Sequence, residues 1–248
     1  MVLTALRGAL GFLSRFPVGR DGDAWAAFAE RPIAFPLVGY LLGALVGLSL
    51  LIPGPPATVG IAFAVGVYAV TGINHVDGVA DLGDALAVHG DATAQREVMK
   101  DTTLGVGGAL AVALVVAGLV TAGSAIAALP AQAAFFAVAA EVGAKAGMAS
   151  LVCVGSSPHD GLGAGFTANA SPRALGPVWL LALPATLLAW PAIVPAAVAL
   201  LAAGVVALAV LRWARSNLGG VTGDVLGAAN EIARVAALHA GVIAWTHW

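Results

Sequence analysis

Seven apolar stretches, each about as long as a membrane-crossing helix, constrain this chain more than any other feature of its sequence. A bilayer core about 30 Å thick needs roughly 20 mainly apolar residues per helix. The stretches cover residues 33–52, 58–73, 104–129, 132–154, 175–190, 193–213 and 225–245. Only 10% of the 248 residues are charged, too few to cover the surface of a water-soluble domain. The sequence therefore predicts an all-α fold, a polytopic transmembrane helix bundle of about seven spans.

The segment before the first span, residues 1–32, is amphipathic rather than continuously apolar. Its leucines recur at a helical period, at positions 3, 6, 10 and 13, and Arg7 and Arg15 interrupt the run. We expect an interfacial helix in this segment. The two halves of the chain do not repeat, so we expect one integral-membrane domain over residues 1–248.

Basic residues are distributed unequally between the two sides of the predicted bundle. Nine of the 11 Lys and Arg residues lie in the N-terminal segment or in the loops after the second, fourth and sixth spans. Loops rich in Lys and Arg stay on the cytoplasmic side of a membrane. We therefore expect a multi-pass protein of the cell (plasma) membrane, with the N-terminus and these loops in the cytoplasm.

Three aspartates follow the second span at a spacing that places them on one helix face. Asp77, Asp81 and Asp84 are at i, i+4 and i+7, within about 60° of each other on a helix. Carboxylates so placed repel one another, and a divalent cation with bound waters and substrate phosphates would relieve that repulsion. This pattern favours a Mg²⁺ site, with Mn²⁺ as the alternative ion, over a solvated acidic loop. His75 is a ligand, a proton carrier or a plain polar residue at the helix start.

A glycine-containing segment, Lys100 to Gly108, opens the third span. The free backbone N–H groups of such a helix start favour phosphate. Lys100 would add a charge contact, and Asp101 another metal ligand. Glycine is also common at the ends of membrane helices, so this pattern has a purely structural interpretation as well.

A second glycine-containing segment, residues 218–231, opens the last span. Asp224 and Glu231 are seven residues apart and hence on one helix face. An acid inside a membrane helix is costly unless it is paired or functional, and Arg234 at i+3 would neutralise Glu231 locally. Glu141 and Lys145 in the fourth span form the equivalent i, i+4 pair, which is typical of a helix-stabilising ion pair.

Together these motifs resemble the cobalamin synthase family, also called the adenosylcobinamide-GDP ribazoletransferases. The family's H-x-D-G-x-x-D-x-x-D pattern matches residues 75–84, its M-[KR]-D-x-x-x-G pattern residues 99–105, and its L-G-G-x-T-G-D-x-x-G-A pattern residues 218–228. The segments Ser-Arg-Phe-Pro-Val at 14–18 and Phe-Pro-Leu-Val-Gly at 35–39 are also similar to family segments. The departures are Ser14 where Thr is common, Ala85 where Gly is usual, and Lys145 where Arg is expected.

The resemblance implies a transferase that acts late in cobalamin biosynthesis, a phosphotransferase for substituted phosphate groups. The ribose 3′-hydroxyl of α-ribazole, or of its 5′-phosphate, would attack the cobinamide-linked phosphorus of adenosylcobinamide-GDP, release GMP and give adenosylcobalamin or its 5′-phosphate. The implied catalytic residues are His75, Asp77 and Asp81, with the general base left open between a carboxylate and His75. The implied metal ligands are Asp77, Asp81, Asp84, Asp101, Asp224 and Glu231. The implied substrate contacts are Arg15, Lys100, Gly105, Lys145, Gly220, Thr222 and Gly223. The expected partners are these two substrates, the lipid bilayer, and a second copy or other late cobalamin enzymes, but no nucleic acid.

Two other classes of membrane protein share some of these features. A CDP-alcohol phosphotransferase-like enzyme also has spaced aspartates, but Asp77-Gly78 lacks that family's downstream Ala-Arg pair. A transporter would show internal repeats and a site near the membrane midplane, whereas most acids here lie near the expected cytoplasmic edge. The sequence therefore favours the transferase.

Overall fold

Helices make up all the regular structure in the part of the chain that the computed structural model describes, residues 2–19, 21–89, 91–99, 101 and 103–247. The α-helices are α1 (Val2–Leu13), α2 (Gly22–Ala29), α3 (Ala34–Gly47), α4 (Pro56–Thr71), α5 (Asn74–Ala87), α6 (Ala92–Val98), α7 (Val106–Ala127), α8 (Phe135–Val154), α9 (Leu162–Thr167), α10 (Leu175–Ala182), α11 (Ile193–Asn217) and α12 (Gly223–Thr246). Short 3₁₀ turns cover Leu48–Leu51, Ala131–Ala134, Pro172–Ala174 and Leu183–Ala189. The all-α prediction is confirmed.

The seven predicted spans correspond to helical segments of the structure. Five segments are long and apolar enough to cross a membrane: Ala34–Leu51, Val106–Ala127, Ala131–Val154, Pro172–Ala189 and Ile193–Asn217. Helices α4 and α5 pass this test only as a pair, bent by 104° at the break between them. Helix α12 has the necessary length, 24 residues, but carries three charged residues. The prediction of about seven spans is thus consistent with five or six spans of ordinary composition and one charged helix.

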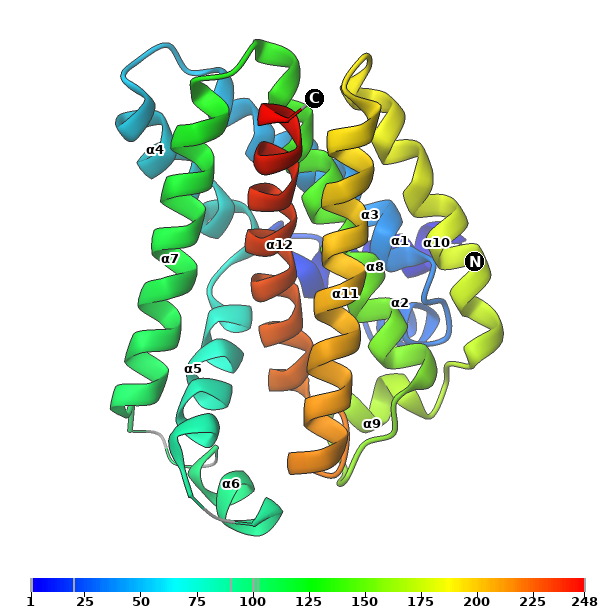
Figure 1. Cartoon of the computed structure of the whole chain (residues 1–248). Coiled ribbons are helices and arrows are strands. Elements are labelled where there is room, and N and C mark those ends of the chain that lie inside the picture. The colour runs from blue at the N-terminus through cyan, green and yellow to red at the C-terminus, as the bar shows by residue number, and fades with distance from the viewer. Residues whose placement is uncertain (1, 20, 90, 100, 102, 248) are drawn as a thin grey trace.

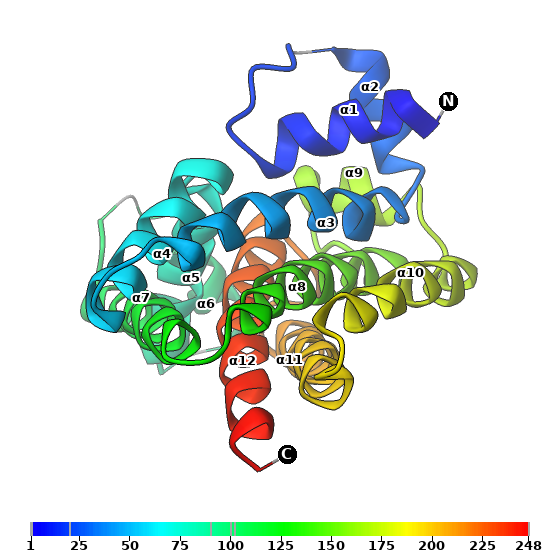
Figure 2. The same cartoon turned by 90° about the horizontal axis from the view of Figure 1, so that it is seen from above.

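Helix α8 lies in the middle of the bundle, between α3 on one side and α11 and α12 on the other (Figure 2). Small residues permit this close packing, as membrane helices commonly require. A Cβ added at Gly43 of α3 would lie 2.6 Å from the Cα of Val138 in α8. Every residue from Phe136 to Cys153 except Ser150 is buried, and the buried residues include Glu141 and Lys145. The bundle therefore has a charged pair at its centre.

The acidic segment is a helix of the bundle rather than a loop between two spans. Helix α4 ends at Gly72, whose φ of +78° favours glycine, and the chain then turns into α5. Helix α5 packs between α7 and α12 and runs toward the lower end of the bundle in Figure 1. Helix α6, the first turn of α7 and the loop between α11 and α12 lie at the same end. The polar motifs predicted from the sequence therefore gather at one end of the molecule.

Helices α1 and α2 form a hairpin beside α3 and α9, outside the main bundle (Figure 2). An aromatic cluster joins this hairpin to the bundle. The Phe166 ring of α9 lies 4.9 Å from that of Trp25 and 5.1 Å from that of Phe28, centroid to centroid. The predicted N-terminal helix is thus present as α1, and its position in the interface of a bilayer stays a prediction.

Candidate functional site

The predicted acidic face of α5 lines a pocket at one end of the bundle. Four predicted metal ligands, Asp77, Asp81, Asp84 and Asp101, meet around this cavity of about 260 Å³. Met99, Thr103 and Leu104 complete the wall opposite α5. Asp77 is exposed and Asp81 is half-buried. The heptad-like spacing of the aspartates therefore produces the shared face that the sequence predicts.

Asp84 has a second task, because it holds the first turn of α7. Its Oδ2 accepts a hydrogen bond from the Gly105 N–H and its Oδ1 one from the Gly108 N–H, both at 2.8 Å. Negatively charged side chains at a helix N-terminus accept hydrogen bonds from otherwise unpaired amides and interact favourably with the positive end of the helix dipole. A Cβ at Gly105 would lie 2.3 Å from Asp84 Oδ1. Gly105, a predicted substrate contact, is thus placed as a donor to the acidic face.

Asp101 lies in the exposed connection before α7. The Thr103 N–H donates a 3.0 Å hydrogen bond to Asp101 Oδ1, and this bond lowers the pKa of the Asp101 carboxyl below its ordinary value. The carboxylate therefore stays ionised and available to a cation. Lys100, the predicted phosphate contact beside it, lies outside the described residues.

The glycine loop before α12 brings Asp224 next to α5. Gly219 and Gly220 have φ values of +81° and +154°, and the Thr222 hydroxyl accepts a hydrogen bond from the Val225 N–H as the cap of α12. A Cβ at Gly78 would lie 2.5 Å from the Asp224 carbonyl oxygen. Asp224 therefore adjoins Asp77 and extends the acidic face.

The four aspartates of this pocket fit a hard divalent cation, because they offer carboxylate oxygens. Among the described residues, no three acidic, imidazole or thiol groups converge into a closed metal cage. Magnesium commonly keeps several waters and binds through one or two carboxylates plus substrate phosphates. An open acidic cavity suits that mode of binding, so the cation site stays a prediction with a matching set of donors.

Two further predicted residues, Lys145 and Glu231, lie in a buried network in the centre of the bundle. Glu141 accepts hydrogen bonds from the Lys145 ammonium, at 2.9 Å, and from Arg234. Arg234 also donates to Glu231. These four side chains are at most 1% exposed. The expected ion pair between Glu141 and Lys145 is present. That Glu231 binds a metal ion and that Lys145 contacts substrate remain predictions, and both side chains are fully buried.

His75 joins this network from the first turn of α5. Its Nδ1 lies 3.2 Å from Asn230 Nδ2 and 3.9 Å from Glu231 Oε1. Sequence reasoning missed Asn230, which is 155 residues from His75 in the chain. The available signal was a polar amide next to Glu231 inside an otherwise small and apolar helix.

Arg15 is exposed at the break between α4 and α5. Its backbone N–H donates to the Val70 carbonyl oxygen at 2.9 Å. Its side chain packs over Gly72, where a Cβ would lie 3.2 Å from Arg15 Cγ. The Arg15 side chain therefore lies at the break between α4 and α5, and its contact with substrate stays a prediction.

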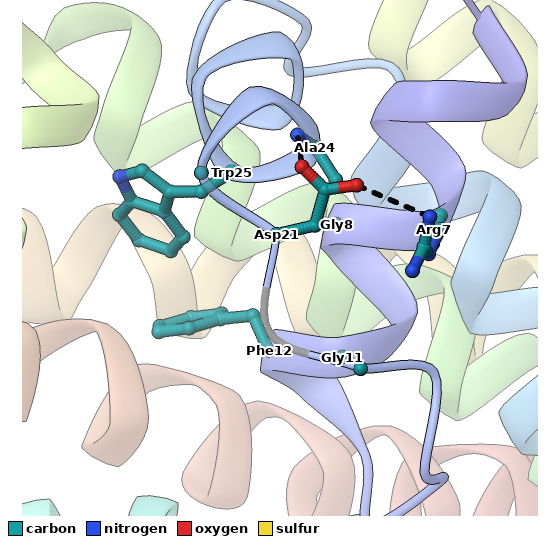
Figure 3. Close-up of a pocket in the computed structure, with 9 residues that line it drawn as sticks. Arg7, Gly8, Gly11, Phe12, Asp21, Ala24 and Trp25 are labelled. Carbon is teal, nitrogen blue, oxygen red and sulfur yellow. Dashed lines mark hydrogen bonds and ion pairs between the residues drawn. The ribbon is translucent and has the colours of Figure 1, made fainter.

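A larger cavity, of about 410 Å³, lies apart from the acidic face, in the N-terminal hairpin. Figure 3 shows Phe12 and Trp25 on one side of it and the pair of Arg7 and Asp21 on the other. The Arg7 guanidinium is engaged by Asp21, at 3.1 Å, and by the Val18 carbonyl oxygen. None of the predicted site residues that the structure describes lines this cavity.

Comparison with known proteins identifies the family. The family model described as cobalamin-5-phosphate synthase matches residues 5–242. Three similar proteins, each named adenosylcobinamide-GDP ribazoletransferase, come from Halorubrum lacusprofundi, Haloquadratum walsbyi and Methanocella arvoryzae. They are 59%, 45% and 34% identical, over 100%, 99% and 98% of this chain and 100%, 99% and 97% of their own length. No solved structure matches the chain significantly. With a family match over nearly its whole length and an acidic face built from the family's motif residues, the chain belongs to the cobalamin-5-phosphate synthase family.

Proposed function

We propose that this chain transfers α-ribazole, or its 5′-phosphate, to adenosylcobinamide-GDP with release of GMP. The observation that carries the proposal is the acidic pocket, in which the family motif residues Asp77, Asp81, Asp84 and Asp101 line one cavity. The names of the full-length relatives support the same reaction. The product is adenosylcobalamin or its 5′-phosphate, which carries the assembled nucleotide loop.

The reaction exchanges a phosphoanhydride bond for a phosphoester bond. The ribose 3′-hydroxyl oxygen forms a bond to the cobinamide-linked phosphorus, the bond from that phosphorus to the bridging oxygen breaks, and GMP leaves with the electron pair. The hydroxyl proton passes to a base, which we assign to a carboxylate of the acidic face. Mg²⁺, when bound, supplies charge stabilisation for the pyrophosphate oxygens.

The chain's own residues position the reactants. Asp77 and Asp81 line the cavity and, among the described residues, their carboxylates have no ion-pair partner. Asp84 instead accepts hydrogen bonds from the Gly105 and Gly108 N–H groups at the start of α7. Arg15, exposed beside Gly72, binds a phosphate of the nucleotide in this proposal. The role of Glu231 is then to hold Arg234 and Asn230 rather than to contact the cation.

Purified protein tests the function directly. With adenosylcobinamide-GDP and α-ribazole, we expect Mg²⁺-dependent GMP release, supported also by Mn²⁺. Asp77→Ala and Asp81→Ala should each lower the rate by at least about 100-fold, the range for loss of one charge-stabilising or proton-transferring group. The matched control is Asp23→Ala, because Asp23 is an exposed aspartate of α2 outside the acidic pocket. Full activity in both α5 variants, or metal-independent release, would refute the proposal.

Orientation in the plasma membrane is a separate part of the proposal, with the acidic end of the bundle in the cytoplasm. Cys153 is the single cysteine and is buried, so single-cysteine variants in a Cys153→Ala background report sidedness. Thr93 belongs to α6, at the acidic end of the bundle, and Gln132 belongs to the 3₁₀ turn between α7 and α8, at the opposite end (Figure 1); both are exposed. A membrane-impermeant maleimide added to intact cells should label Gln132→Cys and spare Thr93→Cys. The reverse pattern would contradict this orientation.

The remaining partners in the proposal are other protein chains. A second copy or a complex with other late cobalamin enzymes is expected by resemblance, and light scattering of the protein in detergent checks the first of these. A monomeric mass would contradict the homo-oligomer.

A further inference from the structure

The Asn230 side chain uses both ends of its amide inside the buried network. Its Oδ1 accepts a 2.7 Å hydrogen bond from the Lys145 ammonium. Its Nδ2 donates to Glu231 Oε1 at 2.9 Å and lies 3.2 Å from His75 Nδ1. Asn230 is fully buried, so its hydrogen bonds are all made to protein groups. One amide thus connects α8, α12 and α5.

Lys145 determines which way this amide faces. An ammonium has three donors and no acceptor, and a carboxylate is an acceptor only. Turning the amide over would place its NH₂ against the Lys145 ammonium and its oxygen against the Glu231 carboxylate. Both contacts would then be repulsive in a site without water to screen them. The orientation with Oδ1 toward Lys145 is therefore the stable one, and Nδ2 faces His75.

The orientation of the amide in turn selects the tautomer of His75. A neutral imidazole has one N–H donor and one acceptor nitrogen. Because Asn230 Nδ2 is a donor, Nδ1 of His75 must be the acceptor, and the ring proton is then on Nε2. The alternative acceptor for an Nδ1 proton, Glu231 Oε1, lies 3.9 Å away, beyond hydrogen-bond distance. In the described part of the chain, Nε2 has no hydrogen-bond partner, and the His75 side chain remains 11% exposed.

We infer that Asn230, oriented by Lys145, is a positioning residue that holds His75 with its proton on Nε2, so that the outer ring nitrogen is a hydrogen-bond donor and does not take the hydroxyl proton. This inference rests on the proposed function for the reacting groups. It resolves the choice between His75 and a carboxylate as base in favour of a carboxylate. It also gives Lys145 and Glu231 a role through Asn230, in place of direct contact with substrate or cation.

Amide replacements of His75 test the direction of the hydrogen bond. His75→Gln places an N–H close to the position of Nε2 but cannot take a proton. His75→Asn reaches only the position of Nδ1, so its oxygen can accept from Asn230 and the outer donor is lost. We expect kcat for GMP release to fall by no more than about tenfold in His75→Gln and by at least about 100-fold in His75→Asn. The control is His239→Gln, because His239 contacts the Gly118 carbonyl oxygen on α7, away from the acidic pocket. Equal loss in both His75 variants would overturn the inference.

Nitrogen-15 NMR of histidine-labelled protein in lipid nanodiscs reads the tautomer without any need for activity. His75→Gln identifies the His75 signals among the five histidines. We expect an unprotonated Nδ1 and a protonated Nε2 in the wild type. Asn230→Asp replaces the donor with an acceptor, and Nδ1 should then carry a proton. A protonated Nδ1 in the wild type would overturn the inference. The expected tautomer in a protein without transferase activity would refute the proposed function alone.

Discussion

Removing one charge from the central network, by Glu141→Gln, should destabilise the bundle more than any single change at its acidic end. In the wild type the two glutamates and the two cations, Lys145 and Arg234, balance to zero net charge, and all four are at most 1% exposed. Glu141 binds both cations. The variant therefore leaves one uncompensated buried positive charge. Breaking a buried ion pair in this way costs about 3–5 kcal/mol, a large part of a total stability of about 5–15 kcal/mol.

A second substitution separates charge balance from hydrogen bonding. Glu141→Gln combined with Lys145→Met restores a neutral network, but it leaves Asn230 Oδ1 without its donor. An unsatisfied buried acceptor costs about 1–3 kcal/mol, so the double variant should be more stable than Glu141→Gln alone. The double variant should be about 2 kcal/mol more stable than Glu141→Gln, and it should cost less than the sum of the two single variants, as expected for coupled sites.

Equilibrium unfolding in mixed detergent micelles, followed by circular dichroism, measures these differences. The six tryptophans give a second probe in the same samples. The variant Gly176→Ala is the matched control, because a Cβ there meets no atom within 4 Å. A loss below about 1 kcal/mol in Glu141→Gln, or a double variant that costs the sum of the two single ones, would refute the account of a charge-balanced core.

Three further predictions concern the acidic end of the bundle. Asp84→Asn should weaken the start of α7, because an amide NH₂ would replace one of the two oxygens that accept from Gly105 and Gly108. The loss of this cap should cost about 1 kcal/mol of stability. Faster hydrogen exchange of the amides of those two glycines measures it. Gly78→Ala should lower the free energy of unfolding by about 1–3 kcal/mol and lower kcat, because the new methyl would lie 2.5 Å from the Asp224 carbonyl oxygen. Measurements of unfolding and of GMP release compare this variant with Gly176→Ala. Equal behaviour of the two variants would contradict the close packing of α5 and α12. Arg15→Ala should raise KM for adenosylcobinamide-GDP by about tenfold, the effect of losing one charged hydrogen bond of about 1.5 kcal/mol. Arg15→Lys should recover part of this loss. An unchanged KM of Arg15→Ala in initial-rate measurements would show that Arg15 does not bind the substrate.

The sequence predicts the membrane helices and the acidic face because both depend on local periodicity. Runs of about 20 apolar residues and aspartates spaced by four and three residues indicate helices and shared faces without knowledge of the fold. The break after α4 was less predictable, since it depends on the positive φ of Gly72 and on the Arg15 side chain packed over it. The sequence predicts a helix face for the acidic segment, but not that this helix packs between α7 and α12 within the bundle.

Contacts between distant parts of the chain account for what the sequence could not predict. The pairing of Glu231 with Arg234 is visible at i+3, but Arg234 also binds Glu141, 93 residues away. Asn230 contacts Lys145 and His75 across 85 and 155 residues. The spacing of the aspartates predicts that Asp84 is a metal ligand. Only the packing of α5 against α7 shows that its oxygens also accept backbone hydrogen bonds. In each case a residue's helix was predictable and its partner was not.

Binding of Mn²⁺ to the purified protein, followed by electron paramagnetic resonance, tests most directly whether the acidic face of α5 holds the cation used in transfer. We expect the wild type and Asp23→Ala to bind Mn²⁺ in the presence of adenosylcobinamide-GDP, and the double variant Asp77→Asn/Asp81→Asn to lose both this binding and GMP release. Unchanged Mn²⁺ binding in the double variant would contradict the assignment of the reaction to this pocket.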